Sequence, residues 1–99
     1  MLDSRTRSLL TGLASTEAVT MHLGKAGAGD ALAAQLDTLL NRHELVRLRF
    51  TDFKDERRTI AEELAGRTRS EVVRVIGNTA LFFRRNPDPA LRRIELPGD

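Results

Sequence analysis

Residues 19–30 read VTMHLGKAGAGD, and this stretch decides the fold because it predicts two kinds of structure joined by glycines. Val19, Met21 and Leu23 alternate with polar neighbours, as in a half-buried β-strand. The glycines that follow adopt positive φ at low cost and allow another group to approach the backbone closely. From Asp30 onward, apolar residues recur with helical spacing. The stretch therefore predicts a strand that leads through a glycine loop directly into a helix.

The rest of the chain continues this alternation of helices and strands. Apolar periodicity predicts helices over residues 3–14, 30–42 and 51–67. Alternating apolar residues predict strands over residues 18–23, 43–50, 71–76 and 79–85. Gly77-Asn78 separates the last two strands and suits an antiparallel hairpin. The order α-β-α-β-α-β-β predicts a two-layer α/β fold in which three helices pack on a four-stranded mixed sheet.

The chain length of 99 residues fits one domain, which we place at residues 1–85. Residues 86–99 contain all three prolines and end in polar residues, so we expect an extended or flexible tail. The absence of cysteine excludes disulfides, thiolate nucleophiles and cysteine-ligated metal sites. Apolar runs are far too short to span a bilayer, and the N-terminal residues lack a signal-peptide core. We therefore expect a cytoplasmic protein with no membrane partner.

Side-chain alternation assigns the strand residues to two faces of the sheet. One face is apolar, and we expect helices to cover it with Val19, Met21, Leu23, Val46, Leu48, Phe50, Val73, Val75, Leu81 and Phe83 in the core. The other face is expected to be partly open and carries Arg47, Arg49, Arg74 and Arg84, with Arg85 just beyond. Few acidic residues lie nearby in the sequence, so this row of guanidinium groups suits the phosphates of a nucleic acid. A solvated surface balanced by carboxylates is the alternative explanation.

The loop formed by Gly24, Lys25, Ala26 and Gly27 offers a second place for an anion. The first N–H groups of the helix that follows have no partner within that helix and carry partial positive charge. The glycines would let a phosphate approach these groups, and Lys25 adds a full charge. The loop lacks the GxxxxGK[ST] pattern of nucleotide hydrolases. A tight turn with a purely structural role would explain the same glycines.

The residues suggest no catalytic, metal or cofactor site. His22 and His43 are the only histidines, and neither has acidic or histidine neighbours at metal-ligand spacing. A small hydrolase built on His43 and Glu44 is the one enzymatic alternative. Among the four phenylalanines, Phe82 falls on the open face and is the candidate for stacking on a base. We therefore expect a non-enzymatic protein with no small-molecule substrate.

Four segments together carry a resemblance to a known family: LGKAGAGD (residues 23–30), NRHELVRLRF (41–50), ERRTIAEELA (56–65) and EVVRVIGNTALFFRRNP (71–87). In this order they resemble the YhbY family, the free-standing bacterial form of the CRM domain (chloroplast RNA splicing and ribosome maturation). The resemblance covers roughly residues 2 to 88. Members commonly have a threonine cap after the loop, where this chain has Gly29.

The resemblance implies an RNA-binding fold similar to the C-terminal domain of translation initiation factor three. It also implies association with ribosomal RNA in precursors of the large (50S) subunit, and contact between RNA and the loop at residues 24–27. We expect a monomer that holds phosphates with this GxxG loop and with the five arginines named above. The alternative is a protein-interaction module that docks an acidic partner on the same basic face.

Overall fold

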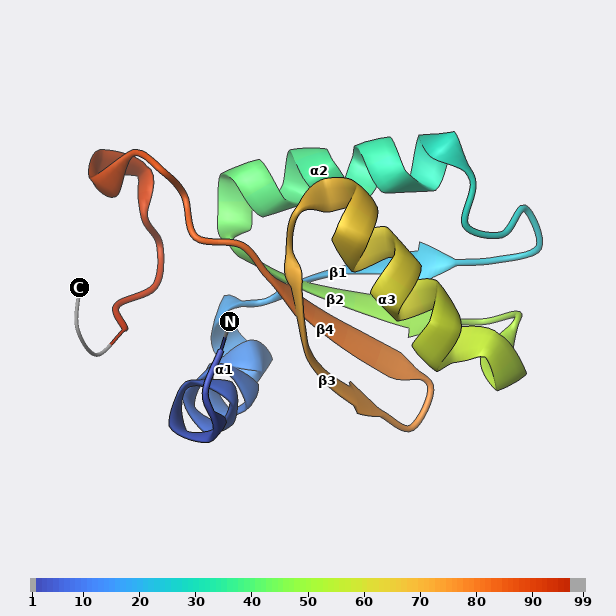
Figure 1. Cartoon of the computed structure of the whole chain (residues 1–99), viewed down its shortest axis with the longest axis horizontal. Coiled ribbons are helices and arrows are strands. Elements are labelled where there is room, and N and C mark those ends of the chain that lie inside the picture. The colour runs from blue at the N-terminus through green and yellow to red at the C-terminus, as the bar shows by residue number, and fades with distance from the viewer. Residues whose placement is uncertain (1, 97–99) are drawn as a thin grey trace.

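The computed structural model describes residues 2–96 and has the expected order of elements (Figure 1). The helices and strands are α1 (Ser4–Glu17), β1 (Val19–Leu23), α2 (Asp30–His43), β2 (Leu45–Phe50), α3 (Arg57–Thr68), β3 (Glu71–Ile76) and β4 (Thr79–Phe83). Short 3-10 turns, η1 (Lys54–Glu56) and η2 (Pro89–Leu91), precede α3 and follow β4. The α/β fold with three helices and a four-stranded mixed sheet is therefore confirmed. Within the described residues, no helix has the length and apolar character needed to cross a membrane.

The strand order is β1-β2-β4-β3, with β1 parallel to β2 and the other neighbours antiparallel. Leu23 of β1 is paired with Phe50 of β2, so both strands end at the same edge of the sheet. The turn between β3 and β4 also reaches this edge, where the Phe50 N–H donates to the Asn78 carbonyl at 2.7 Å. Three loops therefore meet at one end of the molecule: residues 24–27, 51–53 and 77–78.

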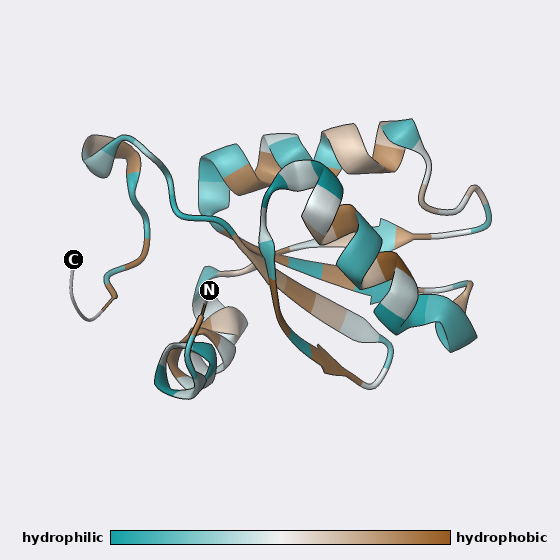
Figure 2. Cartoon of the chain, in the orientation of Figure 1, coloured by the Kyte–Doolittle hydropathy of each residue, from teal (hydrophilic) through white to brown (hydrophobic). Residues whose placement is uncertain are grey.

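Helices cover both faces of the sheet. On one face α2 and α3 enclose the larger core, which contains Met21, Leu23, Leu36, Leu40, Val46, Leu48, Phe50, Leu64, Ala80 and Phe82. On the opposite face α1 packs over one end of the sheet, where the smaller core contains Leu10, Ala14, Leu45, Val73, Leu81, Phe83 and Ile94. Figure 1 shows α1 apart from the other two helices, and Figure 2 shows apolar residues concentrated in the strands between them. The second face is thus covered by α1 at one end and open at the other.

The side chains of β4 face opposite to the sequence prediction. Leu81 and Phe83 were expected with the apolar residues of β1 and β2, but they lie under α1 instead. The cause is the two-residue turn, which pairs Ile76 with Thr79 and thereby fixes the register of the hairpin. With this register Phe82 points into the larger core, where its side chain is fully buried.

β3 contains an irregularity that alternation alone does not show. The register shifts between Val72 and Arg74, and Val73 is the extra residue. Val72 and Val75 consequently pack against the larger core, whereas Val73 belongs to the smaller one. The expected placement of Val73 with Val75 is therefore wrong, and Arg74 still points to the open side.

Helix ends also depend on local chemistry. The Asp3 carboxylate caps α1 by accepting a hydrogen bond from the Thr6 N–H at 2.8 Å, and this bond lowers the pKa of Asp3 below its ordinary value. α3 continues past Gly66 to Thr68, one residue beyond the predicted end of this helix. It ends where Arg69 adopts a left-handed conformation with φ of +54°.

Glu44 is fully buried at the junction of α2 and β2. Its carboxylate accepts hydrogen bonds from the N–H groups of Asn86 (2.6 Å), Arg93 (2.7 Å) and Ile94 (3.2 Å). The Arg85 guanidinium lies 3.7 Å from the same carboxylate. A buried carboxylate requires such partners, because an isolated charge in the interior is strongly unfavourable. Glu44 therefore fixes the C-terminal segment to the domain.

The C-terminal segment, expected as an extended or flexible tail, makes specific contacts with the domain. Residues 86–94 lie against the rest of the domain. The side chain of Ile94 is only 3% exposed and is part of the smaller core. Apart from η2 the segment has no regular secondary structure, so the bonds to Glu44 and the burial of Ile94 hold it in place. The boundary expected at residue 85 thus does not separate a free tail, although residues 97–99 lie outside the described part.

Candidate nucleic-acid interface

The part of the sheet that α1 leaves uncovered is the candidate interface. We call it the open sheet face and define it by Thr20, His22, Arg47, Arg49, Arg74, Ile76 and Thr79. Arg49 lies between His22 and Thr79 on the neighbouring strands. None of the seven residues is acidic. Glu71 is the acidic strand residue on this side, but it lies at the far end, where it accepts a hydrogen bond from the Leu2 N–H.

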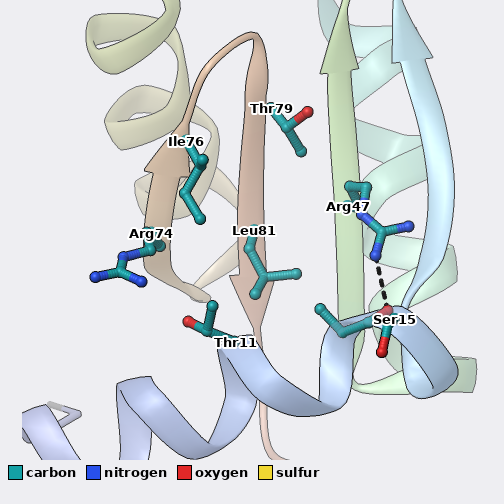
Figure 3. Close-up of a pocket in the computed structure, with 8 residues that line it drawn as sticks. Thr11, Ser15, Arg47, Arg74, Ile76, Thr79 and Leu81 are labelled. Atoms are coloured by element: carbon teal, nitrogen blue, oxygen red, sulfur yellow. Dashed lines mark hydrogen bonds between the residues drawn. The ribbon is translucent and has the colours of Figure 1, made fainter.

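Arg49 and Arg74 are the accessible cations of this face. Both side chains are exposed, and neither makes a hydrogen bond or ion pair within the described residues. Arg47 differs, because its guanidinium donates to the Ala14 carbonyl at 2.8 Å, the dashed line in Figure 3, and to the Thr20 hydroxyl at 3.0 Å. Arg47 therefore joins the end of α1 to the sheet and retains a positive charge beside the open surface.

Arg84 does not lie on the open sheet face, so its expected placement is wrong. It follows β4 by one residue and shares the side of Phe82, which faces α2 and α3. Its guanidinium donates to the Asp37 carboxylate at 2.6 Å and to the Asn41 side chain at 2.8 Å. A further bond of 2.6 Å reaches the Thr68 carbonyl at the end of α3. Arg84 thus connects the two helices, and a carboxylate balances its charge.

Arg85 is also drawn away from the open surface. Its guanidinium donates to the Ile94 carbonyl and lies beside the buried Glu44 carboxylate. The side chain is 22% exposed. The structure therefore brings together Arg47, Arg49 and Arg74, whereas the other two predicted arginines hold structural elements in place.

The GxxG loop is a tight turn closed by a hydrogen bond of 3.0 Å from the Gly27 N–H to the Gly24 carbonyl. Gly27 has φ of +75°, a conformation that favours glycine. The Thr51 N–H and hydroxyl both donate to the Leu23 carbonyl, at 2.9 and 3.0 Å, and fix the base of the loop. Lys25 at the tip is exposed to solvent, so the turn presents one cation at the end of the sheet.

The start of α2 lies directly behind this turn. Gly29 occupies the capping position and provides no side-chain hydrogen bond to the helix. The first N–H groups of α2 are therefore without a side-chain cap and carry the positive end of the helix dipole. Asp30, which would repel a phosphate, pairs with Arg67 of α3 at 2.5 Å. Arg67 also approaches the Ala28 carbonyl at 3.5 Å, so this arginine both neutralises Asp30 and supports the loop.

The exposed aromatic residue is Phe53, and the expectation that Phe82 is exposed is wrong. Phe82 is fully buried, whereas Phe53 is 38% exposed beside the GxxG loop. A Cβ placed on Gly27 would lie 3.5 Å from the Phe53 ring. The available signal was the setting of Phe53 in the polar segment TDFKDE, which offers it no apolar face to join. Asp52, Asp55 and Glu56 line the same hollow as Phe53, so the surroundings of this ring are mainly acidic.

The fold and this surface define a class: a small α/β domain with a basic sheet face, next to a glycine turn at a helix start. Within the described residues, no group of three or more His, Cys, Asp or Glu side chains could hold a metal ion. The chain belongs to the CRS1 / YhbY (CRM) domain family, whose sequence model matches residues 2–84. The expected family is thereby confirmed.

Individual relatives agree with this assignment. The probable RNA-binding protein PA4753 of Pseudomonas aeruginosa is 38% identical over 64 residues, which are 64% of this chain and 62% of that protein. The probable RNA-binding protein YqeI of Bacillus subtilis is 26% identical over 98 residues, covering 98% of this chain and 100% of that protein. The solution structure of the hypothetical protein SAV1595 from Staphylococcus aureus, described as a candidate RNA-binding protein, matches with a TM-score of 0.78. It shares 31% identity and covers 98% of this chain and 100% of its own.

Proposed function

We propose that this protein binds RNA with its open sheet face and the GxxG loop. The observation that carries the proposal is the arrangement of Arg47, Arg49 and Arg74 on one sheet face that has no carboxylate among its defining residues. Membership of a family with relatives named as probable RNA-binding proteins supports it independently.

The chemistry of the face favours phosphates over bases. A guanidinium forms paired, charge-assisted hydrogen bonds with phosphate oxygens, and Arg49 and Arg74 are free of competing bonds within the described residues. Lys25 and the uncapped N–H groups of α2 add a second anion position at the end of the sheet. Contacts of this kind position a protein on a nucleic acid without reading its sequence. Binding should therefore tolerate many sequences and weaken as salt rises.

Two double variants test the proposal. Arg49→Ala with Arg74→Ala removes two charges from the open sheet face, and Arg5→Ala with Arg42→Ala removes two from exposed helix positions. We expect the first pair to weaken binding of a structured RNA and to lower the slope of log Kd against log salt by about 1.5, since each phosphate contact contributes about 0.7–0.9. The control pair should leave the slope nearly unchanged. Equal losses in both would show that net charge, not this face, governs binding.

The RNA we propose is ribosomal RNA in precursors of the 50S subunit, bound in the cytoplasm by a monomer without catalytic activity. The family resemblance supports this choice. Sedimentation of a cell extract through a sucrose gradient tests it, because the protein should travel with immature large-subunit particles and dissociate at high salt. Sedimentation only at the top of the gradient, at low salt, would contradict the ribosomal assignment while leaving RNA binding itself open to the previous experiment.

A further inference from the structure

A cavity of about 300 Å³ lies between α1 and the open sheet face (Figure 3). Its apolar wall consists of Ala14 from α1, Leu81 from β4 and Ile76 from β3. Ile76 is 54% exposed, although it is a large β-branched residue on a sheet. Ile76 therefore gives the cavity an apolar surface that no helix covers, whereas Leu81 and Ala14 beside it are only 6% and 8% exposed.

Polar groups surround this apolar wall. Hydroxyl groups come from Thr11 and Ser15 on α1 and from Thr79 on β4. The Thr11 hydroxyl donates to the Arg7 carbonyl at 2.8 Å, so toward the cavity it can act only as an acceptor. The hydroxyls of Ser15 and Thr79 make no hydrogen bond within the described residues and can donate or accept.

Two arginines are among the residues that line the cavity, and the side chain of Arg74 points outward from β3 (Figure 3). Figure 3 shows Arg47 and Arg74 on opposite sides of Leu81. Arg47 is held in place by its bonds to Ala14 and Thr20, whereas Arg74 makes none within the described residues. No described residue that lines the cavity is acidic. The site thus combines apolar side chains, the hydroxyls of Ser15 and Thr79, and two positively charged residues.

We propose that this cavity receives the base of one unpaired nucleotide of the bound RNA, an inference that rests on the proposed function. A splayed-out base has an apolar face, hydrogen-bonding edges and an attached phosphate, and sequence-directed RNA recognition commonly uses such bases. The base would lie against Ile76 and Leu81, and its edge would meet the hydroxyls of Ser15 and Thr79. Arg74 would contact the phosphate or stack on the base.

The size and charge of the cavity favour this ligand. Pockets for small molecules measure about 300–1,000 Å³, so this one is at the small end and suits a single ring system. The positive charges favour a ligand that carries phosphate. A base within a duplex cannot enter, because its faces are stacked and its pairing edge is occupied. The cavity would therefore add a preference for unpaired nucleotides to a face that otherwise holds phosphates of any RNA.

Three RNA hairpins test the inference by fluorescence anisotropy: one fully paired, one with a single bulged uridine, and one with an abasic ribose at the bulge. Ile76→Ala removes the exposed part of the apolar wall, and Ser15→Phe fills the cavity from the helix side. Both residues are exposed, so folding should persist, as circular dichroism would verify. Leu91→Ala is the matched control, because Leu91 is 58% exposed on η2, away from the cavity.

The chain with its natural sequence should bind the bulged hairpin more tightly than the paired one. Ile76→Ala and Ser15→Phe should each weaken binding of the bulged hairpin roughly fivefold or more, from the usual contribution of base stacking, and should leave the paired and abasic hairpins unchanged. Equal loss on all three hairpins, or no loss on any, would overturn the inference while leaving phosphate binding intact. If the natural chain bound none of the three hairpins, the proposed function itself would be wrong.

Discussion

Gly27 shows how a single residue determines the shape of the candidate interface. Its φ of +75° closes the turn that presents Lys25, and an L-residue in this region has its Cβ too close to the following carbonyl. Space is not the constraint, since a Cβ would lie 3.5 Å from Phe53, an ordinary contact. Backbone conformation alone therefore accounts for the glycine at this position. The presence of Gly27 is thus no evidence that the loop binds an anion, and that proposal depends on Lys25 and the N–H groups at the start of α2.

Two glycine substitutions should change stability in opposite directions. Gly27→Ala should destabilise the domain by roughly 1–2 kcal/mol, because alanine must adopt positive φ. Gly12→Ala should stabilise it by roughly 0.5–1 kcal/mol, because Gly12 lies inside α1 and nothing lies within 4 Å of the added methyl group. Urea denaturation followed by circular dichroism measures both. Destabilisation of similar size in the two variants would contradict the conformational argument.

At the scale of elements, periodicity was sufficient to predict which segments form helices and strands. It was not sufficient to orient the last two strands. The two-residue turn at Gly77-Asn78 pairs Ile76 with Thr79, and this register, not side-chain alternation within each strand, decides which face each residue of β4 occupies. For this reason Phe82 lies in the core and not on the surface, and Arg84 lies on the helix side and not on the open side. The bulge at Val73 has no comparable sequence signal, because its neighbours on both sides are also apolar or long.

The contacts that the C-terminal segment makes with the domain could not be predicted from its own sequence either. Its prolines and charges indicate an extended segment, and the backbone is indeed mostly irregular. Glu44 lies about half the chain away in sequence, and only the fold brings its carboxylate to the N–H groups of Asn86, Arg93 and Ile94. Long-range hydrogen bonds to a buried carboxylate thus convert a segment that resembles a linker into part of the core.

Replacement of Ile94 tests whether this segment contributes to stability. Ile94→Ala should lower the free energy of unfolding by about 2–4 kcal/mol, because the side chain is 3% exposed and packs in the core under α1. Leu91→Ala, only three residues earlier but 58% exposed, should change it by no more than about 0.5 kcal/mol. Thermal and urea unfolding distinguish the two. A negligible effect of Ile94→Ala would show that the segment is detached in solution.

At the scale of the whole molecule, the arginines on the two faces of the sheet have different roles. On the helix-covered side Arg84 and Arg67 pair with Asp37 and Asp30, and they connect α2 to α3. On the open side Arg49 and Arg74 have no such partners within the described residues. The formal net charge is only +2, so the RNA binding that we propose depends on this separation of charge and not on the total.

Arg84→Ala tests that separation, since it removes the same single charge as Arg49→Ala from the opposite face. Arg84→Ala should lower the free energy of unfolding by roughly 1.5–3 kcal/mol, because its bonds to Asp37 and the Thr68 carbonyl are lost. It should leave the salt dependence of RNA binding unchanged when affinity is measured at a temperature where the variant stays folded. Arg49→Ala should do the reverse, leaving unfolding nearly unchanged and reducing the slope of log Kd against log salt by about 0.7–0.9. If Arg84→Ala flattened that slope as much as Arg49→Ala, phosphates would have to reach both faces, and the assignment of RNA to the open sheet face would be wrong.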